Sequence, residues 1–174
     1  LRHAIAAETR FGVGAEFKNK RAHEVMDRNW HVSNITAHYK DKAWKQLGTS
    51  GSGNHFVEFG ELEILEDGLA IPRGTYLALL SHSGSRGTGA QVCDHYSKLA
   101  QQLCPYDLPG EAKHLAWLDL KSEAGQEYWE AMELMGHYAA ANHECIHQHI
   151  AANLGAGVRW QLQNHHNFAW RERH

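Results

Sequence analysis

Leu47-Gly-Thr-Ser-Gly-Ser-Gly-Asn-His-Phe-Val-Glu-Phe59 is the stretch from which the rest of the sequence is best interpreted. Its glycines, Gly48, Gly51 and Gly53, allow tight turns and let the backbone approach a ligand closely. Backbone N–H groups and hydroxyls in such a loop suit phosphate oxygens. The alternating run that follows predicts a strand, so His55 lies where a loop meets a rigid element. That position suits a metal ligand or an acid–base group, although an ordinary connecting loop with a surface histidine is the alternative.

Composition limits the class of protein. The 174 residues fit one domain with a substantial core. Lys and Arg number 17 against 20 Asp and Glu, for a formal charge of -3, so any contact with RNA or DNA needs a local basic patch rather than bulk charge. The 15 histidines point to metal or proton chemistry. Three cysteines without a C-x-x-C pair predict a reduced, cytoplasmic protein, and no stretch reaches transmembrane length.

The expected fold is α+β, in which mixed or antiparallel sheets are flanked by helices within a single domain over residues 1–174. Ser33 and Gly155 are a predicted helix N-cap and a predicted helix stop. Hydrophobic periodicity predicts a short helix within residues 1–20 and longer helices over 33–46, 88–104 and 123–154. Strands are predicted over 55–66, with a bulge near Gly60, over 75–81 as a buried strand, and over 158–163.

Three histidine segments lie at predicted junctions between a strand and a loop. They are centred on His55, on His82 and on the pair His165-His166. Imidazoles that converge from separate strands can bind a transition metal such as Mn, Fe, Co or Zn. Neighbouring groups suited to a phosphate or a nucleotide are Asn54, Arg86 and Asn167. Together the three segments favour a metal and phosphate site over scattered surface histidines.

A different motif lies on the long predicted helix. His143-Glu-Cys-Ile-His147 matches the H-E-x-x-H pattern of zinc peptidases. The extended form of that motif is absent, because Ile150 occupies the position of its glycine. A zinc-dependent peptidase that uses His143, Glu144 and His147 is therefore an alternative function. A third possibility is a non-catalytic fragment that binds RNA or a nucleotide.

Three motifs, taken in order, resemble those of the RtcB family of GTP-dependent RNA ligases: Gly48 to Glu58, His82-Ser-Gly-Ser-Arg-Gly87 and Asn164-His-His-Asn-Phe-Ala169. Gly125-Gln-x-Tyr128 and Ala141-Asn142 are similar to the central region of that family. The resemblance implies an enzyme of tRNA splicing or RNA repair. It would join an RNA 3′-phosphate or 2′,3′-cyclic-phosphate end to a 5′-hydroxyl end through guanylylated intermediates, with GTP and Mn²⁺.

The resemblance also implies roles for individual residues. His55, His82 and His166 would bind Mn²⁺ as the catalytic residues, and Arg86 would hold an RNA phosphate. Residues implied in guanine nucleotide binding are Asn54, His55, Phe56, Val57, Glu58, His166 and Asn167. The family's segments that carry a metal-binding Asp and Cys and the guanylylated histidine have no counterpart here. The resemblance therefore covers the central part of a catalytic core, and we expect that this chain alone does not form the covalent His–GMP intermediate.

Overall fold

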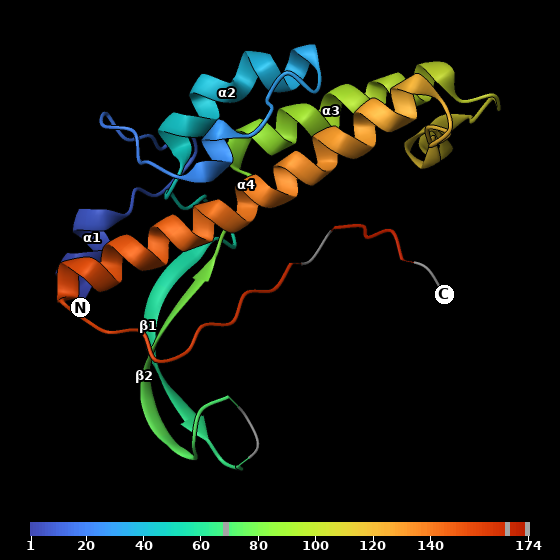
Figure 1. The fold of residues 1–174 in the computed structure, drawn as a ribbon. Helices are drawn as coiled ribbons and strands as arrows, with labels where there is room; N and C mark the ends of the chain where they lie inside the picture. The colour runs from blue at the N-terminus through green and yellow to red at the C-terminus, as the bar shows by residue number, and fades with distance from the viewer. Residues whose placement is uncertain (68–69, 166–167, 173–174) are drawn as a thin grey trace.

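The computed structural model describes residues 1–67, 70–165 and 168–172, and it confirms the α+β class (Figure 1). The helices are α1 (Arg2–Glu8), η1 (Glu24–Asp27), α2 (Asn34–Gln46), α3 (Arg86–Leu103), η2 (Gly110–Leu115) and α4 (Glu123–Leu154). The strands are β1 (Phe56–Ile64) and β2 (Gly74–His82), which pair as a two-stranded antiparallel sheet. In Figure 1, α2 and α3 lie on one side of α4 and the hairpin lies on the other.

The long helix α4 is the element on which the other parts are assembled. Ser122 begins it by accepting a hydrogen bond from the Gly125 backbone N–H at 3.1 Å. Gly155 ends it in the left-handed conformation with φ of 62°, as predicted. Its buried stripe includes Tyr138 and Ile150, so the predicted apolar face is confirmed as core. Among the described residues, no helix combines the length and apolarity needed to cross a bilayer.

The two shorter helices of the core begin with different local signals. Ser33 caps α2 as predicted, and with Thr36 it forms a capping box. Helix α3 begins at Arg86, two residues before its predicted start, and Arg86 has a φ of 55°. A positive φ is uncommon for a residue with a side chain, so the surrounding contacts must hold Arg86 in place.

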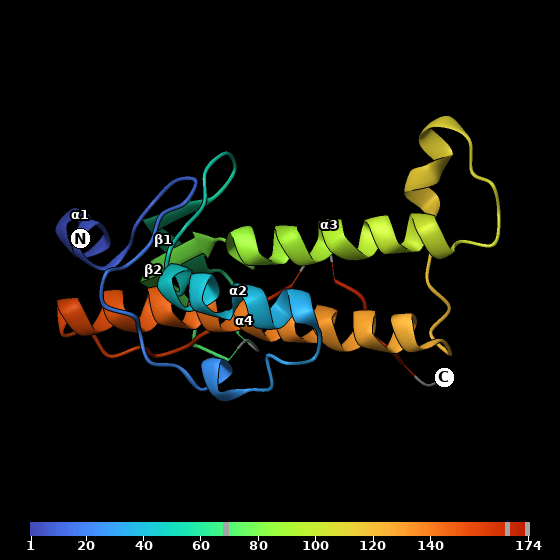
Figure 2. The ribbon, with the colours of Figure 1, turned by 90° about the horizontal axis from the view of Figure 1, so that it is seen from above.

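Most of the core lies among the three helices α2, α3 and α4; in Figure 2, α3 and α4 run side by side and α2 is seen in front of α4. Trp30 and Tyr138 meet edge to face with ring centroids 5.9 Å apart, and Tyr96 completes the aromatic centre. A second, smaller cluster joins the hairpin to α4. Its buried members are Ala4, Val57, Ile146 and Ile150. The hairpin is therefore fixed to the helices at the end where β1 begins and β2 ends.

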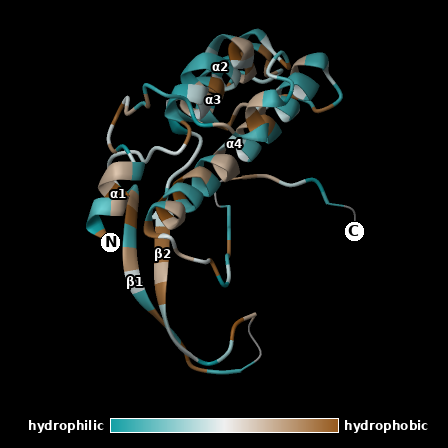
Figure 3. Cartoon of the chain, turned by 60° about the vertical axis from the view of Figure 1, so that its left-hand side comes forward, coloured by the Kyte–Doolittle hydropathy of each residue, from teal (hydrophilic) through white to brown (hydrophobic). Residues whose placement is uncertain are grey.

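The hairpin differs from the prediction in two respects. Gly60 pairs in regular register with Ala78, so the expected bulge is absent from the described strands. Strand β2 is not buried, because its residues Leu77 and Leu80 are 64% and 54% exposed. The apolar run of β2, visible as its largely hydrophobic colour in Figure 3, is the feature from which burial of this strand was predicted. An apolar run indicates burial only when a second layer covers both faces of the strand.

The strand predicted over 158–163 is wrong. These residues form an extended segment with no strand partner, and they run back beneath α4 (Figure 1). Strand structure requires a neighbouring chain to accept its backbone hydrogen bonds, and alternation of side chains cannot supply one. The segment is instead attached by a side chain: Nε2 of Gln163 donates to the Ala140 carbonyl at 3.0 Å.

Candidate functional site

Asn142 on α4 holds together two of the loops that carry predicted site residues. Its side chain is fully buried, and its Oδ1 accepts a hydrogen bond from the Gly48 backbone N–H at 2.7 Å. Its Nδ2 donates to the Thr49 carbonyl and Ser83 Oγ at 3.0 Å, and to the Gly84 carbonyl at 3.4 Å. A buried amide is tolerated only when its polar atoms are satisfied. One side chain therefore fixes the Gly/Ser loop relative to the loop that follows β2.

Gly51 lies between the ring of His55 and the guanidinium of Arg86. A Cβ at position 51 would lie 2.7 Å from Nη1 of Arg86 and 2.7 Å from Nδ1 of His55, so only glycine fits there. Arg86 donates from Nε to Thr49 Oγ1 at 2.9 Å and from Nη2 to the Gly12 carbonyl at 3.1 Å. Burial lowers the pKa of its guanidinium. Arg86 thus ties the Gly/Ser loop to the N-terminal segment, a structural role that its sequence motif did not indicate.

The rings of His55 and His82 are neighbours, with centroids 5.6 Å apart and planes at 73°. His82 also stacks on Phe56 at 5.9 Å, because the strand register places these two residues opposite each other. Nδ1 of His55 lies 2.9 Å from the Ser52 carbonyl. A carbonyl can only accept, so Nδ1 carries the hydrogen and the lone pair of His55 is on Nε2, where a ligand can use it.

The other predicted nucleotide contacts lie on different faces of β1. Asn54 is exposed on the turn before the strand, and Glu58 is exposed on the same face as Phe56. Val57 points the opposite way, into the cluster with Ile146 and Ile150, so its side chain faces the core. His166 and Asn167 lie outside the described residues, and their predicted roles remain predictions.

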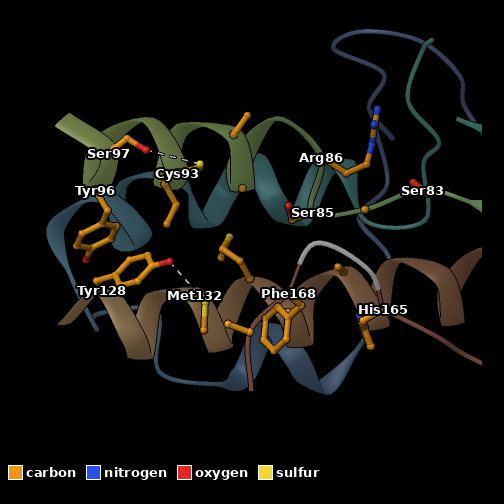
Figure 4. A pocket seen from close by; sticks show the side chains of 18 of the residues that line it. Ser83, Ser85, Arg86, Cys93, Tyr96, Ser97, Tyr128, Met132, His165 and Phe168 are labelled. Atoms are coloured by element: carbon orange, nitrogen blue, oxygen red, sulfur yellow. Dashed lines mark hydrogen bonds between the residues drawn. The ribbon is translucent and has the colours of Figure 1, made fainter. Parts of the chain in front are cut away.

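A cavity of about 1070 Å³ opens beside these histidines and extends between α3 and α4. Figure 4 shows Arg86, Ser83 and His165 at one end of it and Tyr96 and Tyr128 at the other. The side chains that line the histidine end are those of Asn54, His55, His82, Arg86, His143 and His165. The imidazoles and the Arg86 guanidinium therefore lie at one end of the cavity, and the Tyr96 and Tyr128 rings lie at the other.

Phe168 enters the same cavity from the C-terminal segment (Figure 4). It lies against α4 at Gly136, where a Cβ would be 2.5 Å from Cε2 of the phenyl ring. The ring of His165 lies near it, with centroids 6.1 Å apart. Gly136 therefore provides the seat for the segment that carries the third histidine motif.

The chain is similar to proteins of a known family. The model of the family described as tRNA-splicing ligase RtcB matches residues 1–174. The chain belongs to the RtcB family. It is 28% identical over 183 aligned residues to the tRNA-splicing ligase RtcB of Methanococcus maripaludis, an alignment that covers 97% of this chain and 38% of that protein. It is 32% identical to the tRNA-splicing ligase RtcB of Nanoarchaeum equitans, over 72% of this chain and 27% of that protein.

A eukaryotic relative gives a similar match. The RNA-splicing ligase RtcB homolog 1 of Entamoeba dispar is 32% identical over 126 residues, which cover 68% of this chain and 23% of that protein. The chain thus spans well under half the length of the RtcB relatives it matches. Family membership supports the resemblance found in the three histidine motifs.

The H-E-x-x-H motif of this RtcB-family chain does not have the arrangement of a zinc peptidase site. His143 and His147 both direct a ring nitrogen to Ser81 Oγ, at 2.8 and 2.9 Å. Glu144 faces away from them and pairs with His23, at 3.0 Å between Oε2 and Nε2. A peptidase needs the two imidazoles free for metal and the carboxylate beside them. The geometry therefore disfavours the peptidase alternative.

The residues that the RtcB motifs bring together have the right chemistry for a transition metal. Across residues 1–67, 70–165 and 168–172, no three His, Cys, Asp or Glu side chains are already grouped closely enough to hold an ion. Two of the three predicted ligands, His55 and His82, are nevertheless adjacent, and the Nε2 lone pair of His55 is available. Imidazole nitrogen suits Mn²⁺, Fe²⁺ and Zn²⁺. The donor set therefore fits such an ion once a further ligand joins it.

Sequence reasoning missed what Asn142 and His143 contribute to this site. From the sequence, Asn142 is only part of a family resemblance, and His143 is only part of the peptidase motif. A signal was present in the sequence, because Asn142 is four residues after Tyr138 and so falls on the apolar stripe of α4. A polar residue on a buried stripe predicts a satisfied amide, but it does not say which groups satisfy it.

Proposed function

We propose that this chain is part of an RNA ligase that joins a 3′-phosphate or 2′,3′-cyclic-phosphate RNA end to a 5′-hydroxyl end, in tRNA splicing or RNA repair. The reaction uses GTP and Mn²⁺ and passes through guanylylated intermediates. Membership of the RtcB family supports this proposal. The observation that carries it is the adjacent pair His55 and His82, from two segments far apart in the chain, at the mouth of a cavity.

In this proposal, His55, His82 and His166 hold the Mn²⁺ ion. When bound, Mn²⁺ neutralises phosphate charge in the transition state and orients the attacking group. His55 is suited to this role because its Nδ1–H is fixed by the Ser52 carbonyl, which directs the Nε2 lone pair elsewhere. Phe56 supports His82 from the side by stacking, which limits rotation of the imidazole.

The guanine nucleotide is proposed to contact Asn54, the strand residues Phe56 to Glu58, and His166-Asn167. Asn54 and Glu58 support this because both are exposed, next to the two histidines. The side chain of Val57 is turned into the core, so its contribution is limited to the backbone. Arg86 is proposed to hold an RNA phosphate while two of its N–H groups remain committed to Thr49 and Gly12.

Titration with Mn²⁺ tests the proposal, because free Mn²⁺ gives an electron paramagnetic resonance signal that is lost on binding. We expect His55→Ala and His82→Ala to weaken Mn²⁺ binding by at least tenfold. His149→Ala is the matched control, since it removes an imidazole from α4 that is near Glu8 and away from the site. Equal Mn²⁺ binding by all three variants would sink the metal assignment.

Ligation is tested separately on the full natural chain, with a 3′-phosphate RNA, a 5′-hydroxyl RNA, GTP and Mn²⁺. His82→Ala is expected to abolish joining, and His149→Ala is expected to retain it. Joining that persists in His82→Ala would contradict the proposed role of this histidine. Phosphate or RNA binding with no uptake of Mn²⁺ would instead support the non-catalytic binding fragment.

A further inference from the structure

The two histidines of the H-E-x-x-H motif contact the residue that precedes a proposed metal ligand. His143 and His147 lie one turn apart on α4, and both bond to the hydroxyl of Ser81. Ser81 is the penultimate residue of β2, and His82 follows it. One hydrogen bond to Ser81 would be enough to anchor the end of the strand, so the second imidazole indicates an additional role.

The direction of these hydrogen bonds follows from the chemistry of the groups. Burial lowers the pKa of both His143 and His147, so both rings are neutral at pH 7 and each has one donor and one acceptor nitrogen. A hydroxyl has one hydrogen, so Ser81 donates to one of the two imidazoles and accepts from the other.

The three groups therefore form two linked hydrogen bonds, from one imidazole through the Ser81 hydroxyl to the other. Ser81 Oγ lies 2.8 Å from Nδ1 of His143 and 2.9 Å from Nε2 of His147. Together these bonds hold the side chain of Ser81 against α4.

These hydrogen bonds hold the strand residue immediately before His82 against α4. Successive residues of a strand point to opposite faces. Because the side chain of Ser81 points towards α4, that of His82 is directed to the opposite face, where it meets Phe56 and His55. Asn142 adds to the effect, because its Nδ2 bonds to Ser83 Oγ and to the Gly84 carbonyl.

We propose that His143 and His147, acting through Ser81, are positioning residues that aim the His82 imidazole at the metal. We call the three residues Ser81, His143 and His147 the clamp. The clamp rests on the hydrogen bonds just described, whereas the identity of what His82 binds rests on the proposed function. Partners that orient a metal ligand typically alter metal affinity by about 10–100-fold when they are removed. We therefore expect the clamp to affect the metal through His82 without touching it.

Nuclear magnetic resonance of the ¹⁵N-histidine-labelled chain tests the clamp without any metal. The ring signals of His82 are assigned by their loss in His82→Gln. We expect them to shift and broaden in Ser81→Ala, which removes both hydrogen bonds, and in His143→Ala and His147→Ala, which each remove one. Ser81→Thr keeps the hydroxyl and is expected to restore the wild-type signals. His149→Ala, on the same helix but bonded to neither strand residue, should leave them unchanged.

Mn²⁺ titration of the same variants measures the consequence. Affinity is expected to fall about tenfold in Ser81→Ala and His143→Ala and to recover in Ser81→Thr. His82 signals that stay unchanged in both Ser81→Ala and His143→Ala overturn the proposal, whether or not Mn²⁺ binds. If the wild-type chain takes up no Mn²⁺ but its His82 signals respond as expected, the clamp stands and the proposed metal function fails. If Ser81→Ala does not fold, His143→Ala and His147→Ala decide the outcome, and His82 signals that stay unchanged in both overturn the proposal.

Discussion

The two loops around Asn142 and the C-terminal segment 156–172 both carry predicted site residues, but they are attached to α4 in different ways. The loops are joined by a buried amide with four hydrogen-bond partners, and Arg86 adds two more bonds. The described contacts between the C-terminal segment and α4 include one hydrogen bond from Gln163 and the ring of Phe168 against Gly136.

This difference indicates which parts of the site the packing of the chain holds rigidly and which parts can move more easily. A satisfied polar network in a low-dielectric interior is rigid, because any displacement leaves a buried group without a partner. A side chain lying on a helix surface loses little when it moves. The loops that carry His55 and His82 are thus held by the first kind of contact, and Phe168 of the C-terminal segment by the second. Four predictions test this contrast, in order of decreasing effect.

Asn142→Ala should destabilise the chain by about 3 kcal/mol, because the Gly48 N–H and the Ser83 hydroxyl lose buried partners and a cavity forms. Asn153→Ala is the matched control: its Nδ2 donates to Glu8 Oε1 on the surface, and a loss within about 0.5 kcal/mol is expected. Urea unfolding measures both. Equal losses in the two variants would show that the loops are not held as we describe.

Gly51→Ala should displace the His55 ring or the Arg86 guanidinium, since the new methyl group would overlap both. We expect a destabilisation of about 2 kcal/mol from overpacking and a fall in Mn²⁺ affinity of about tenfold. Gly53 is unsuitable as a control because its φ is positive, whereas Gly60 lies in β1 with nothing within 4 Å of its Cβ position. Gly60→Ala should therefore bind Mn²⁺ as the wild type does, and an equal loss in both variants contradicts the crowding at Gly51.

Lowering the pH should loosen residues 81–84, which lie next to His143 and His147, before it loosens the C-terminal segment. Burial depresses the folded-state pKa of His143 and His147 below the ordinary histidine pKa of about 6.5, so the unfolded chain takes up protons first as the pH falls. The contribution of these histidines to stability is therefore full above about pH 6.5 and decreases as the pH falls below it. His137 and His149 have lowered pKa values as well and add to the slope.

Amide hydrogen exchange at pH 7.5 and 5.5 locates this effect. Residues 81–84 should exchange faster at the lower pH, with a smaller change over residues 158–163. His143→Gln should reduce the pH dependence, whereas His38→Gln, at an exposed position on α2, should not. Exchange that accelerates equally in both segments would argue against buried neutral histidines as the cause.

Gly136→Ala should have the smallest effect on stability, within about 1 kcal/mol. Alanine favours the helix by up to about 1 kcal/mol, and this offsets the lost contact with Phe168. The displaced ring should make the bond after Phe168 several-fold more sensitive to chymotrypsin. Gly157→Ala, where a Cβ meets nothing within 4 Å, is the control. Unchanged cleavage in Gly136→Ala would mean that Gly136 does not seat the segment.

Local sequence signals were sufficient to predict most of the helices. Ser33 and Gly155 were predicted as helix ends, and both act as such, because capping depends on groups within a few residues of each other. The strands show the limit of this approach. The segments around β1 and β2 were found, but the bulge at Gly60, the burial of β2 and the strand over 158–163 were not borne out. Each of these depends on what lies beside the strand.

The sequence by itself determined the α+β class, the long amphipathic helix and the order of the histidine motifs, since these follow from periodicity and residue type. Only the tertiary structure decided that Asn142 joins two loops, that Gly51 separates His55 from Arg86, and that the H-E-x-x-H histidines bond to Ser81 rather than converging with Glu144. The physical reason is that hydrogen bonds between residues 34 to 94 positions apart depend on how the elements pack, which local preferences do not encode.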